Sequence, residues 1–365
     1  MDRVKIFGAG SIGNHLAHAS RRLGWSVTVC DVDPNALTRM KQSLYPGRYG
    51  KWDDAITLCR NSEAPKGGFD LICIGTPPDV HLDLALEAIK ERPKALLIEK
   101  PLCPPSLQLA QEVYDAAQRS GVHVFVGYDH VVGRATKKVE ELWHSEAIGS
   151  VETIDVEFRE HWAGIFAAHP WLKGPADTYL GFWERGGGAS GEHSHAMNLW
   201  QHFANLTGVG RVVEVNATLK YVKAEGAHYD SLCLADLRTE QGLIGRVVQD
   251  VVTIPVRKWA RIQGSLGALE WTAGYSQEGD AVTLRRPGKP DEVHLIKKSR
   301  PDDFVQELTE IEASLRERPE ASPISVERGL DTMLVIAASH LSERDKCRVR
   351  IDYGKGYTQR ALAAC

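Results

Sequence analysis

A glutamate and two histidines follow a run of glycines in the middle of the chain. The segment RGGGASGEHSHAMNLW covers residues 185–200 and contains Glu192, His193 and His195. Apolar side chains then recur at helical spacing, so we expect His195 in the first turn of a helix, where the helix dipole favours a neutral imidazole. A neutral imidazole can accept a proton from a hydroxyl group near neutral pH, so a catalytic acid/base is one interpretation of this segment. A metal site and a merely polar helix start are the alternatives.

A lysine at the end of a predicted strand is the second candidate catalytic group. Lys100 lies between Glu99 and Pro101 in the segment KALLIEKP. An ammonium group in this position donates a hydrogen bond to a reacting oxygen and stabilises the alkoxide that develops there. An exposed Glu99–Lys100 charge pair is the alternative.

Three glycines near the N-terminus form the pattern G-x-G-x-x-G. Gly8, Gly10 and Gly13 lie between a strand-like apolar run and a helical pattern. The first glycine of such a turn permits the tight bend, the second lets the backbone approach a pyrophosphate, and the third lets the helix pack close to the strand. We therefore predict a dinucleotide site. Its further expected contacts are Ser11, Ile12, Thr76, Pro77, His81, Glu99 and Lys100.

The predicted cofactor is NAD, and NADP is less favoured. Asp31 closes the second predicted strand, WSVTVCD, near the usual spacing of about 20 residues for an acid that binds the ribose 2′-hydroxyl. A carboxylate at this position repels a 2′-phosphate. The alternative is that Asp31 or Asp33 caps the helix that begins near Pro34.

Strand-like and helical patterns alternate through the first third of the chain. The strand-like segments FDLICIG, KALLIEKP and VHVFVGYD are separated by helical patterns at 76–91 and 106–121. This alternation predicts a parallel sheet covered on both faces, with ligands at the carboxyl ends of the strands. The segment between residues 44 and 69 is irregular, and its pattern places no third strand. We predict an α/β Rossmann domain over residues 1–127.

The pattern changes after about residue 150. Strand-like segments follow without regular intervening helices, and they predict an α+β domain over residues 128–365 with a large, mostly antiparallel open sheet. Helices cover only one side of such a sheet easily, so we expect a second subunit on the other side, in a homodimer or homotetramer. The expected strands are 151–162, 211–223, 227–239, 243–254, 259–274 and 348–354, and the expected helices are 302–317 and 325–343.

Composition and charge describe an ordinary globular protein. The 365 residues are 43% hydrophobic and 25% charged, with a formal net charge of -4. This balance does not favour binding to nucleic acid or to a membrane, and no apolar run is long enough for a membrane span. Seven cysteines, an odd number without a C-x-x-C pair, indicate reduced thiols in a cytoplasmic protein.

Together these motifs resemble the Gfo/Idh/MocA family of sugar and cyclitol dehydrogenases, over nearly the whole chain. The resemblance implies hydride transfer to NAD, with Lys100 polarising the substrate oxygen, Glu99 bracing the lysine and His195 transferring the proton. We expect no bound metal. The motifs that carry the resemblance are Gly8-x-Gly10-x-x-Gly13, GTPPDVHLDLALEAI at 75–89, Glu99-Lys100-Pro101, GYDH at 127–130 and GGGASGEHSH at 186–195.

Two motifs depart from the family pattern. The family usually has D-x-G-x-H before the helix, whereas this chain has Gly191 in place of the aspartate and His193 in place of the glycine. Either Glu192 or His193 replaces the missing carboxylate. In GYDH, Asp129 and His130 stand where many relatives have Asn and Arg, and Asp129 either faces the substrate or caps the following helix. The expected substrate contacts are Lys100, Tyr128, Asp129, Trp171, Glu192, His193 and His195.

Aromatic rings are concentrated around this glycine-rich segment. Flat rings with polar edges suit the faces of sugar rings, although core packing or a subunit interface explains any one of them equally well. We expect the segment 169–188 to be a loop over the site that sets specificity, with Lys173 and Arg185 as candidate partners of a substrate carboxylate or phosphate. The tryptophans concerned are Trp162, Trp171, Trp183 and Trp200.

The predicted function is an NAD-dependent oxidoreductase that interconverts a secondary alcohol and a ketone on a sugar, a cyclitol or a nucleotide-linked sugar. Three alternatives stay open. One is a non-catalytic NAD(P)-binding sensor or regulator of the same fold, and another is a metal-dependent enzyme that uses Glu192, His193 and His195. The third uses tightly bound NAD transiently, for elimination or epimerisation without net oxidation.

Overall fold

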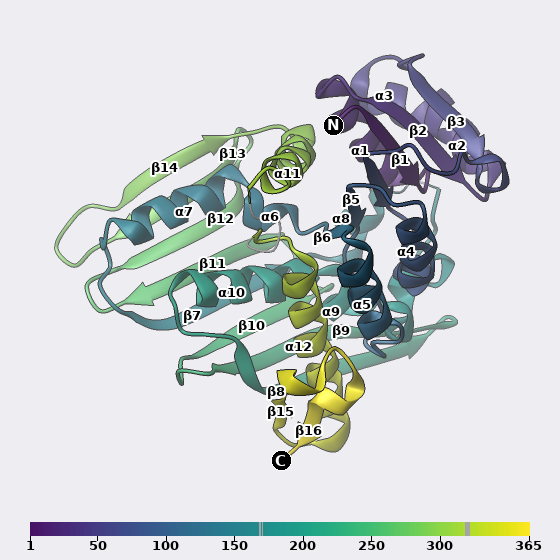
Figure 1. The fold of residues 1–365 in the computed structure, drawn as a ribbon. Helices are drawn as coiled ribbons and strands as arrows, with labels where there is room; N and C mark the ends of the chain where they lie inside the picture. The colour runs from purple at the N-terminus through teal and green to yellow at the C-terminus, as the bar shows by residue number, and fades with distance from the viewer. Residues whose placement is uncertain (168, 170, 318–321) are drawn as a thin grey trace. The chain divides into compact units, whose positions relative to one another are not determined.

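The described residues form two compact units. The computed structural model describes residues 1–167, 169, 171–317 and 322–365, and Figure 1 shows its ribbon. The chain passes from the first unit to the second after Asp129, two residues beyond the predicted boundary at 127/128. It also passes between the units at other points, which the two predicted continuous domains did not include. The first unit comprises Met1–Leu102, Leu109–Asp129 and Arg300–Gly329, and the second comprises Cys103–Gln108, His130–Ser299 and Leu330–Cys365.

A six-stranded parallel sheet is the frame of the first unit. Its strand order is β3-β2-β1-β4-β5-β6. The strands β4 and β5 are buried at every position, as expected where helices cover both faces of a parallel sheet. The predicted Rossmann-type fold is therefore confirmed. The strands are β1 (Arg3–Phe7), β2 (Ser26–Asp31), β3 (Ile56–Arg60), β4 (Leu71–Ile74), β5 (Ala95–Ile98) and β6 (His123–Val126).

The strand β3 lies in the segment where the sequence pattern placed none. It is an edge strand, and its sequence ITLCR has one buried residue and four that are partly or fully exposed, so it lacks the apolar run of a central strand. Helical turns fill the chain between β2 and β3. These are α2 (Pro34–Arg39), a π-helical turn (Met40–Leu44) and α3 (Tyr45–Tyr49).

The helix α11 (Arg300–Ser314) belongs to the first unit although it lies late in the sequence. It packs along α1 (Ser11–Arg22). The ring of Phe304 stacks on His15 with 4.8 Å between the ring centroids, and Asp302 accepts a hydrogen bond of 3.0 Å from Arg22. The other long helices of this unit are α4 (His81–Lys90) and α5 (Ala110–Ser120).

A ten-stranded sheet is the frame of the second unit. Its order is β14-β13-β12-β11-β7-β10-β9-β8-β15-β16, and β7 pairs in parallel with β10 while the other pairings are antiparallel. The predicted large, mostly antiparallel sheet is confirmed. The strands are β7 (Val151–Arg159), β8 (Val212–Ala224), β9 (Ala227–Thr239), β10 (Ile244–Asp250), β11 (Arg257–Gly264), β12 (Ala268–Ser276), β13 (Gly279–Arg285), β14 (Glu292–Lys297), β15 (Val349–Ile351) and β16 (Leu362–Ala364).

Two details of the predicted strands are corrected. The segment 259–274 contains two strands, because the chain turns between β11 and β12, where Gly264 N donates to Gly267 O. The strands β13 and β14 were not predicted. Only His294 and Ile296 of β14 are even partly covered, and its sequence EVHLIK has no clear apolar alternation.

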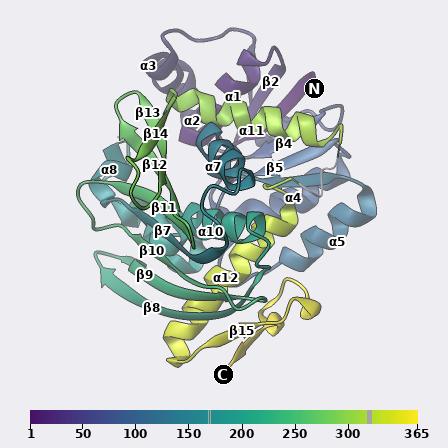
Figure 2. The same cartoon turned by 90° about the vertical axis from the view of Figure 1, so that its left-hand side faces the viewer.

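Helices lie along one face of this sheet, as Figures 1 and 2 show. The helix α7 packs against β12 and β13, α10 against β7 and β10, and α9 against β9. None of the described helices is both long and apolar enough to cross a membrane. The helices are α6 (Asp129–Val132), α7 (Arg134–His144), α8 (Trp162–Ala167), α9 (Gly188–Glu192), α10 (Ser194–Leu206) and α12 (Val326–Asp345), the last of which belongs to this unit from Leu330 onward.

The opposite face of the sheet carries interleaved arginine and acidic side chains. Along each strand these residues alternate with the buried ones that face the helices. Arg246 bonds Asp155 at 3.1 Å, and Arg261 bonds Glu270 at 2.6 Å. This face is therefore polar and ordered by cross-strand ion pairs.

Candidate functional site

The glycine turn after β1 has the geometry of a dinucleotide-binding loop. Gly8 has φ = 104°, and a Cβ on it would lie 2.4 Å from Gly75 O. A Cβ on Gly13 would lie 1.8 Å from Gly8 O, so the helix can approach the turn only with glycine there. A Cβ on Gly10, by contrast, meets no heavy atom within 4 Å. The open space at Gly10 and the first N–H groups of α1, which no described side chain caps, fit a pyrophosphate.

Asp31 at the end of β2 braces this turn. Its Oδ2 accepts a hydrogen bond of 2.7 Å from Ala9 N, and its Oδ1 accepts one of 2.8 Å from Asp33 N. Asp33, not Asp31, caps α2, because the Asp33 side chain accepts from Asn35 N. Asp33 is therefore the residue that caps the helix, as one of the two alternatives proposed. Asp31 instead lies beside the glycine turn, where a ribose hydroxyl would be bound.

We expect Asp31→Asn to weaken the discrimination against NADP. The amide oxygen still accepts from Ala9, whereas the charge that repels a 2′-phosphate is lost. Titration of NADH and NADPH binding by fluorescence should show the ratio of their dissociation constants falling about tenfold or more in the variant. A wild-type protein that binds NADPH more tightly than NADH would contradict the assignment.

Arg48 on α3 is a cofactor-side residue that sequence reasoning missed. Its guanidinium donates hydrogen bonds to Ser11 O at 3.1 Å and to Ser11 Oγ at 3.0 Å, at the start of α1. Its position depends on how the helical turns between β2 and β3 fold, and the sequence pattern gave no signal for that. The structure thus adds a cation beside Ser11, a predicted cofactor contact.

His81 supports the loop after β4. The side chain has no exposed surface, and its Nε2 donates a hydrogen bond of 2.7 Å to Thr76 O. Burial lowers the pKa of His81 to about 4, so the imidazole is neutral at physiological pH. His81 thus supports the backbone at Thr76, and its predicted contact with the cofactor stays a prediction. Tyr128 is likewise fully buried, and its predicted substrate contact stays a prediction.

Glu99 and Lys100 follow β5 directly, at the carboxyl end of the parallel sheet. Glu99 is buried, and burial, together with the neighbouring charge of Asp129, raises its pKa to about 8. Its carboxylate lies so close to Gly127 that a Cβ there would come within 2.8 Å of Oε2. The Lys100–Pro101 peptide bond is cis. The glycine of GYDH thus makes room for the glutamate that precedes the predicted catalytic lysine.

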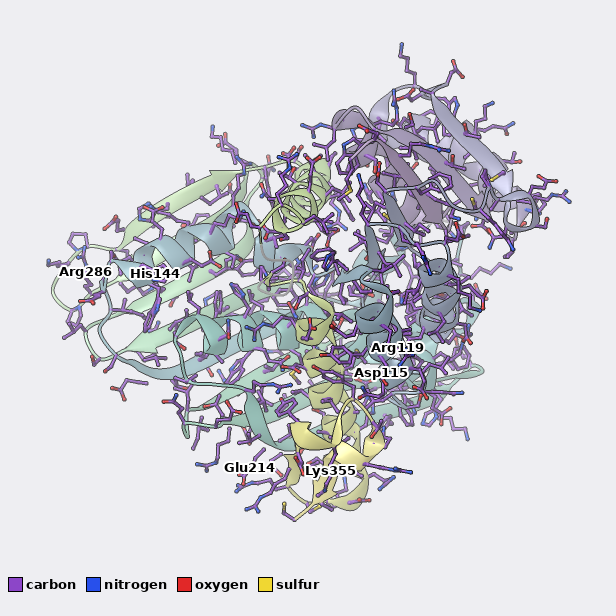
Figure 3. The ribbon with its side chains drawn as sticks, in the orientation of Figure 1. Asp115, Arg119, His144, Glu214, Arg286 and Lys355 are labelled. Carbon is purple, nitrogen blue, oxygen red and sulfur yellow. The ribbon has the colours of Figure 1, made fainter. Side chains whose placement is uncertain are left out.

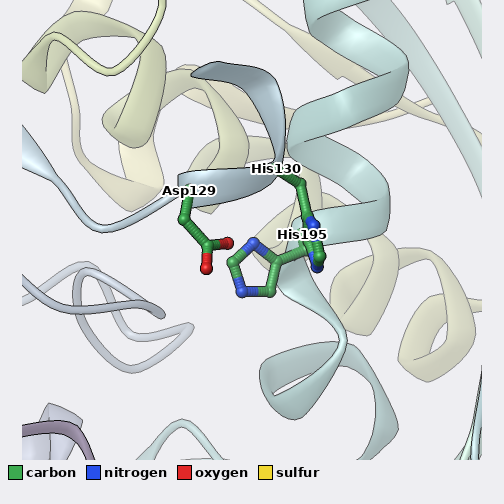
Figure 4. A group of neighbouring side chains, drawn as sticks. All are labelled: Asp129, His130 and His195. Carbon is green, nitrogen blue, oxygen red and sulfur yellow. The ribbon is translucent and has the colours of Figure 1, made fainter. Parts of the chain in front are cut away.

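In the second unit, His195 lies in the first turn of α10, as predicted. Its ring lies 4.6 Å from the ring of His130, with an angle of 69° between the planes. Figure 4 shows these two imidazoles with Asp129, which is joined to His130 in α6. The aromatic rings of Phe158 and Trp271 lie 5.3 Å and 5.5 Å from His130. His130 is thus a member of this group that the sequence analysis noted only as a departure from the family pattern.

The two other candidates of the glycine-rich segment differ in exposure. His193 links α9 to α10 and is buried, and its backbone oxygen accepts a hydrogen bond of 2.7 Å from Gln249 Nε2. Glu192 is the last residue of α9 and is partly exposed. Their exposure therefore leaves Glu192 better placed than His193 to reach a ligand in solution.

Asp230 on β9 anchors the start of α9. Its Oδ2 accepts a hydrogen bond of 2.7 Å from Ser190 N, and a Cβ on Gly188 would lie 1.9 Å from its Oδ1. Ser190 Oγ lies 3.0 Å from His340 Nε2, and the other ring nitrogen of His340 lies 2.6 Å from Tyr221 Oη. This buried network explains the glycine at position 188, since a side chain there would displace Asp230.

We expect the stability of the protein to depend on the titration of Asp230. Burial raises its pKa to about 7, against about 3.9 in an unfolded chain. The folded state keeps a proton that the unfolded state loses, so this group makes folding less favourable as the pH rises from about 4 to about 7. The Asp230→Asn protein has no charge to bury at this position. The difference between its melting temperature and that of the wild type should therefore be larger at about pH 8 than at about pH 5. Parallel pH profiles of the two proteins would contradict this.

The four tryptophans have different environments. Trp200 is fully buried and donates a hydrogen bond of 2.8 Å to Ile154 O, and Trp162 packs in a small apolar cluster, so both follow the core-packing alternative. Trp183 stacks on His340 at 4.6 Å. Trp171 is partly exposed, with its ring 5.4 Å from that of His169. Trp171 is therefore a partly exposed ring of the predicted specificity segment, and its contact with a substrate stays a prediction.

The predicted specificity segment 169–188 contains three short 3₁₀ turns, and its Pro170 lies outside the described residues. Lys173 and Arg185 are both exposed. The guanidinium of Arg185 lies 5.7 Å from the ring centroid of Phe182. Their predicted role toward a substrate anion stays a prediction.

Comparison with known proteins settles the nature of the N-terminal region. Residues 3–128 match the oxidoreductase family with an NAD-binding Rossmann fold known as Gfo/Idh/MocA. Over these residues the chain is similar to the NAD-binding Rossmann domain of that family. The resemblance drawn from the motifs is thereby confirmed for this region, which contains the glycine turn and Asp31.

Further relatives cover more of the chain. A 1-carboxy-3-chloro-3,4-dihydroxycyclohexa-1,5-diene dehydrogenase from Comamonas testosteroni is 28% identical over 197 residues, which span 53% of this chain and 43% of that relative. The WlbA dehydrogenase of Bordetella pertussis, solved with NADH and UDP-GlcNAcA, matches with a TM-score of 0.71 at 20% identity over 96% of this chain and 98% of its own. A putative myo-inositol dehydrogenase from Sinorhizobium meliloti matches with a TM-score of 0.71 at 20% identity over 96% and 99%. These structures share the fold of both units.

Proposed function

We propose that the chain is an NAD-dependent oxidoreductase that interconverts a secondary alcohol and a ketone on a hydroxylated ring, that is, a sugar, a cyclitol or a nucleotide-linked sugar. The observation that carries the proposal is the position of Lys100. It follows β5, two strands from the β1 that leads into the glycine turn, at the sheet edge where ligands of such folds bind.

The side chains divide the chemistry between them. NAD, when bound, takes or supplies the hydride. Lys100 donates a hydrogen bond to the substrate oxygen and stabilises the negative charge that develops on it. Glu99 is held mostly protonated near neutral pH by burial, since its pKa is about 8, and thus leaves the positive charge of Lys100 available to the substrate. His195 accepts the proton of the hydroxyl group during oxidation and returns it during reduction.

The relatives support a ring-borne hydroxyl group as the point of attack. The Comamonas relative is named for a carboxylated dihydroxy ring, and WlbA was solved with a nucleotide-linked sugar. Both ligand types combine hydroxyl groups with an anionic group. Partly exposed Trp171 and the exposed cations Lys173 and Arg185 are the side chains that we assign to the ring and the anion.

A substrate screen tests the proposal. Sugars, cyclitols, sugar nucleotides and carboxylated cyclic diols are incubated with NAD, and NADH absorbance and the ketone product are measured. We expect NADH formation with at least one of these classes. Tight NAD binding without any turnover would support the sensor alternative, and product formation without net NADH would support the transient-NAD alternative.

We also propose a cytoplasmic homodimer or homotetramer that uses the helix-free face of the large sheet. The seven cysteines are all free thiols, which suits a reducing compartment. The ion pairs on the sheet face alternate with exposed apolar side chains such as Leu234 and Ile244. Sedimentation analysis should give two or four chains per particle, and Ile244→Asp should shift the particle toward monomers. A monomeric wild type would contradict this arrangement.

A further inference from the structure

Three potential metal ligands meet where α6 and α10 begin. Asp129, His130 and His195 each offer one ligand atom, and these atoms all lie within 4.8 Å of one another. Asp129 and His130 are consecutive residues of α6, so a peptide bond holds the carboxylate beside the first imidazole, and His195 adds the second. Figure 4 shows the Asp129 carboxylate next to the His195 ring.

We propose that Asp129, His130 and His195 form a binding site for a divalent transition-metal ion, with Zn²⁺ as the preferred ion. One carboxylate and two imidazoles are a donor set that suits zinc and neighbouring metals, and three protein ligands leave a coordination position open for water or a substrate oxygen. Metal–ligand bonds of about 2.0–2.2 Å place neighbouring donor atoms about 3.0–3.6 Å apart. Small side-chain rotations that move the donor atoms by about an ångström therefore bring them from their present separations to the distances of a coordinated ion.

The surroundings of His130 hold its ring in place before any ion binds. Phe158 and Trp271 lie at 5.3 Å and 5.5 Å from the ring, stack on each other with planes 6° apart, and are nearly fully buried. The backbone oxygen of His130 accepts a hydrogen bond of 2.6 Å from Thr136 Oγ1. The packed rings restrict the side chain of His130, so it loses less conformational freedom when it binds a metal ion.

The ligand set differs from the one that the sequence suggested. Among the described residues, Glu192 and His193 do not join a group of metal-ligating side chains, whereas Asp129 and His130 do. The H-x-H pair is separated because α10 begins between its two histidines. Asp129 and His130, the two residues of GYDH that depart from the family pattern, are therefore the metal ligands that we propose together with His195.

Metal binding has a consequence for turnover. A metal ion and a proton compete for the same imidazole nitrogen. If His195 is the acid/base of the proposed function, saturating Zn²⁺ inhibits turnover reversibly, and a chelator restores it. This consequence rests on the proposed function, whereas the binding itself does not.

Binding is measured on the full chain without an affinity tag, after treatment with a chelator and without NAD or substrate. Calorimetric titration with ZnCl₂ and visible absorption of the Co²⁺-loaded protein report stoichiometry, affinity and coordination. We expect one equivalent of metal, and at least about a tenfold loss of affinity in His130→Gln and in Asp129→Asn. Unchanged NADH binding and melting temperature show that each variant is folded.

His144→Gln is the matched control, because His144 is an exposed histidine at the end of α7, labelled in Figure 3. It should bind zinc like the wild type. The proposal is overturned if the wild type binds no metal, or if His130→Gln and Asp129→Asn bind it as tightly as His144→Gln does. Loss of dehydrogenase activity in every substrate screen, with metal binding intact, would count against the proposed function alone.

Discussion

Lys100→Met and His195→Asn are each expected to lower kcat by about a thousandfold or more. Methionine fills a similar volume to lysine but cannot donate to the substrate oxygen, and asparagine cannot exchange the proton. Neither residue is part of the glycine turn, so the dissociation constant of NADH should change far less than kcat, by about twofold in His195→Asn and by somewhat more in Lys100→Met, since Lys100 is also an expected cofactor contact. NADH formation gives kcat, and fluorescence titration gives cofactor affinity.

Two exposed positions supply the controls for these variants. Lys90 on α4 pairs only with Glu87 at the surface among the described ion pairs, and His144 on α7 is exposed. Lys90→Met and His144→Gln should retain wild-type turnover. Turnover that survives in Lys100→Met or His195→Asn would remove that residue from the mechanism. Loss of NADH binding in the same variants would mean that they disturb the fold.

The second large effect is expected from a pair of glycines in the same turn. A Cβ on Gly10 meets no heavy atom within 4 Å, whereas one on Gly13 would lie 1.8 Å from Gly8 O. Gly10→Ala should therefore keep the melting temperature but raise the NAD dissociation constant about tenfold or more, because the methyl group occupies the space of the pyrophosphate. Gly13→Ala should lower the melting temperature by several degrees, since the helix must move away from the turn.

The pair separates cofactor binding from folding. NADH titration measures the cofactor binding of each variant, and thermal unfolding without cofactor measures its folding. If Gly10→Ala binds NAD like the wild type, the pyrophosphate does not approach this turn. If Gly13→Ala unfolds at the wild-type temperature, the α1–β1 contact tolerates a side chain, and its packing is looser than the structure shows.

The first unit was largely predictable because its signals are local. The glycine spacing and the alternation of apolar runs with helical patterns are properties of short segments, and they predicted five of its strands. The edge strand β3 was missed because only one residue of ITLCR is buried. A helix was expected after Asp129, but its bounds were not given. The helix α7 buries Ala135, Val139 and Leu142 at helical spacing.

The candidate site was predictable only where its residues follow a local pattern. The first turn of α10 placed His195, and the end of β5 placed Lys100. The meeting of His130 with His195 depends on how α6 packs near α10, and no spacing in the sequence encodes it. The same holds for Ser190, Asp230 and His340, which lie far apart in the chain and meet only in the folded unit. The substitutions in GYDH were the only sequence signal for this part of the site.

The position of α11 in the first unit bears on how the protein is made. The helix packs along α1, and Phe304 covers the ring of His15, yet about three hundred residues separate the two helices in the chain. During synthesis the ribosome therefore finishes all six strands of the NAD-binding sheet long before it delivers the helix that belongs beside α1. Until then, the nascent cofactor domain exposes an uncovered helix surface, which makes it a natural client for chaperones and makes an isolated N-terminal fragment prone to aggregate.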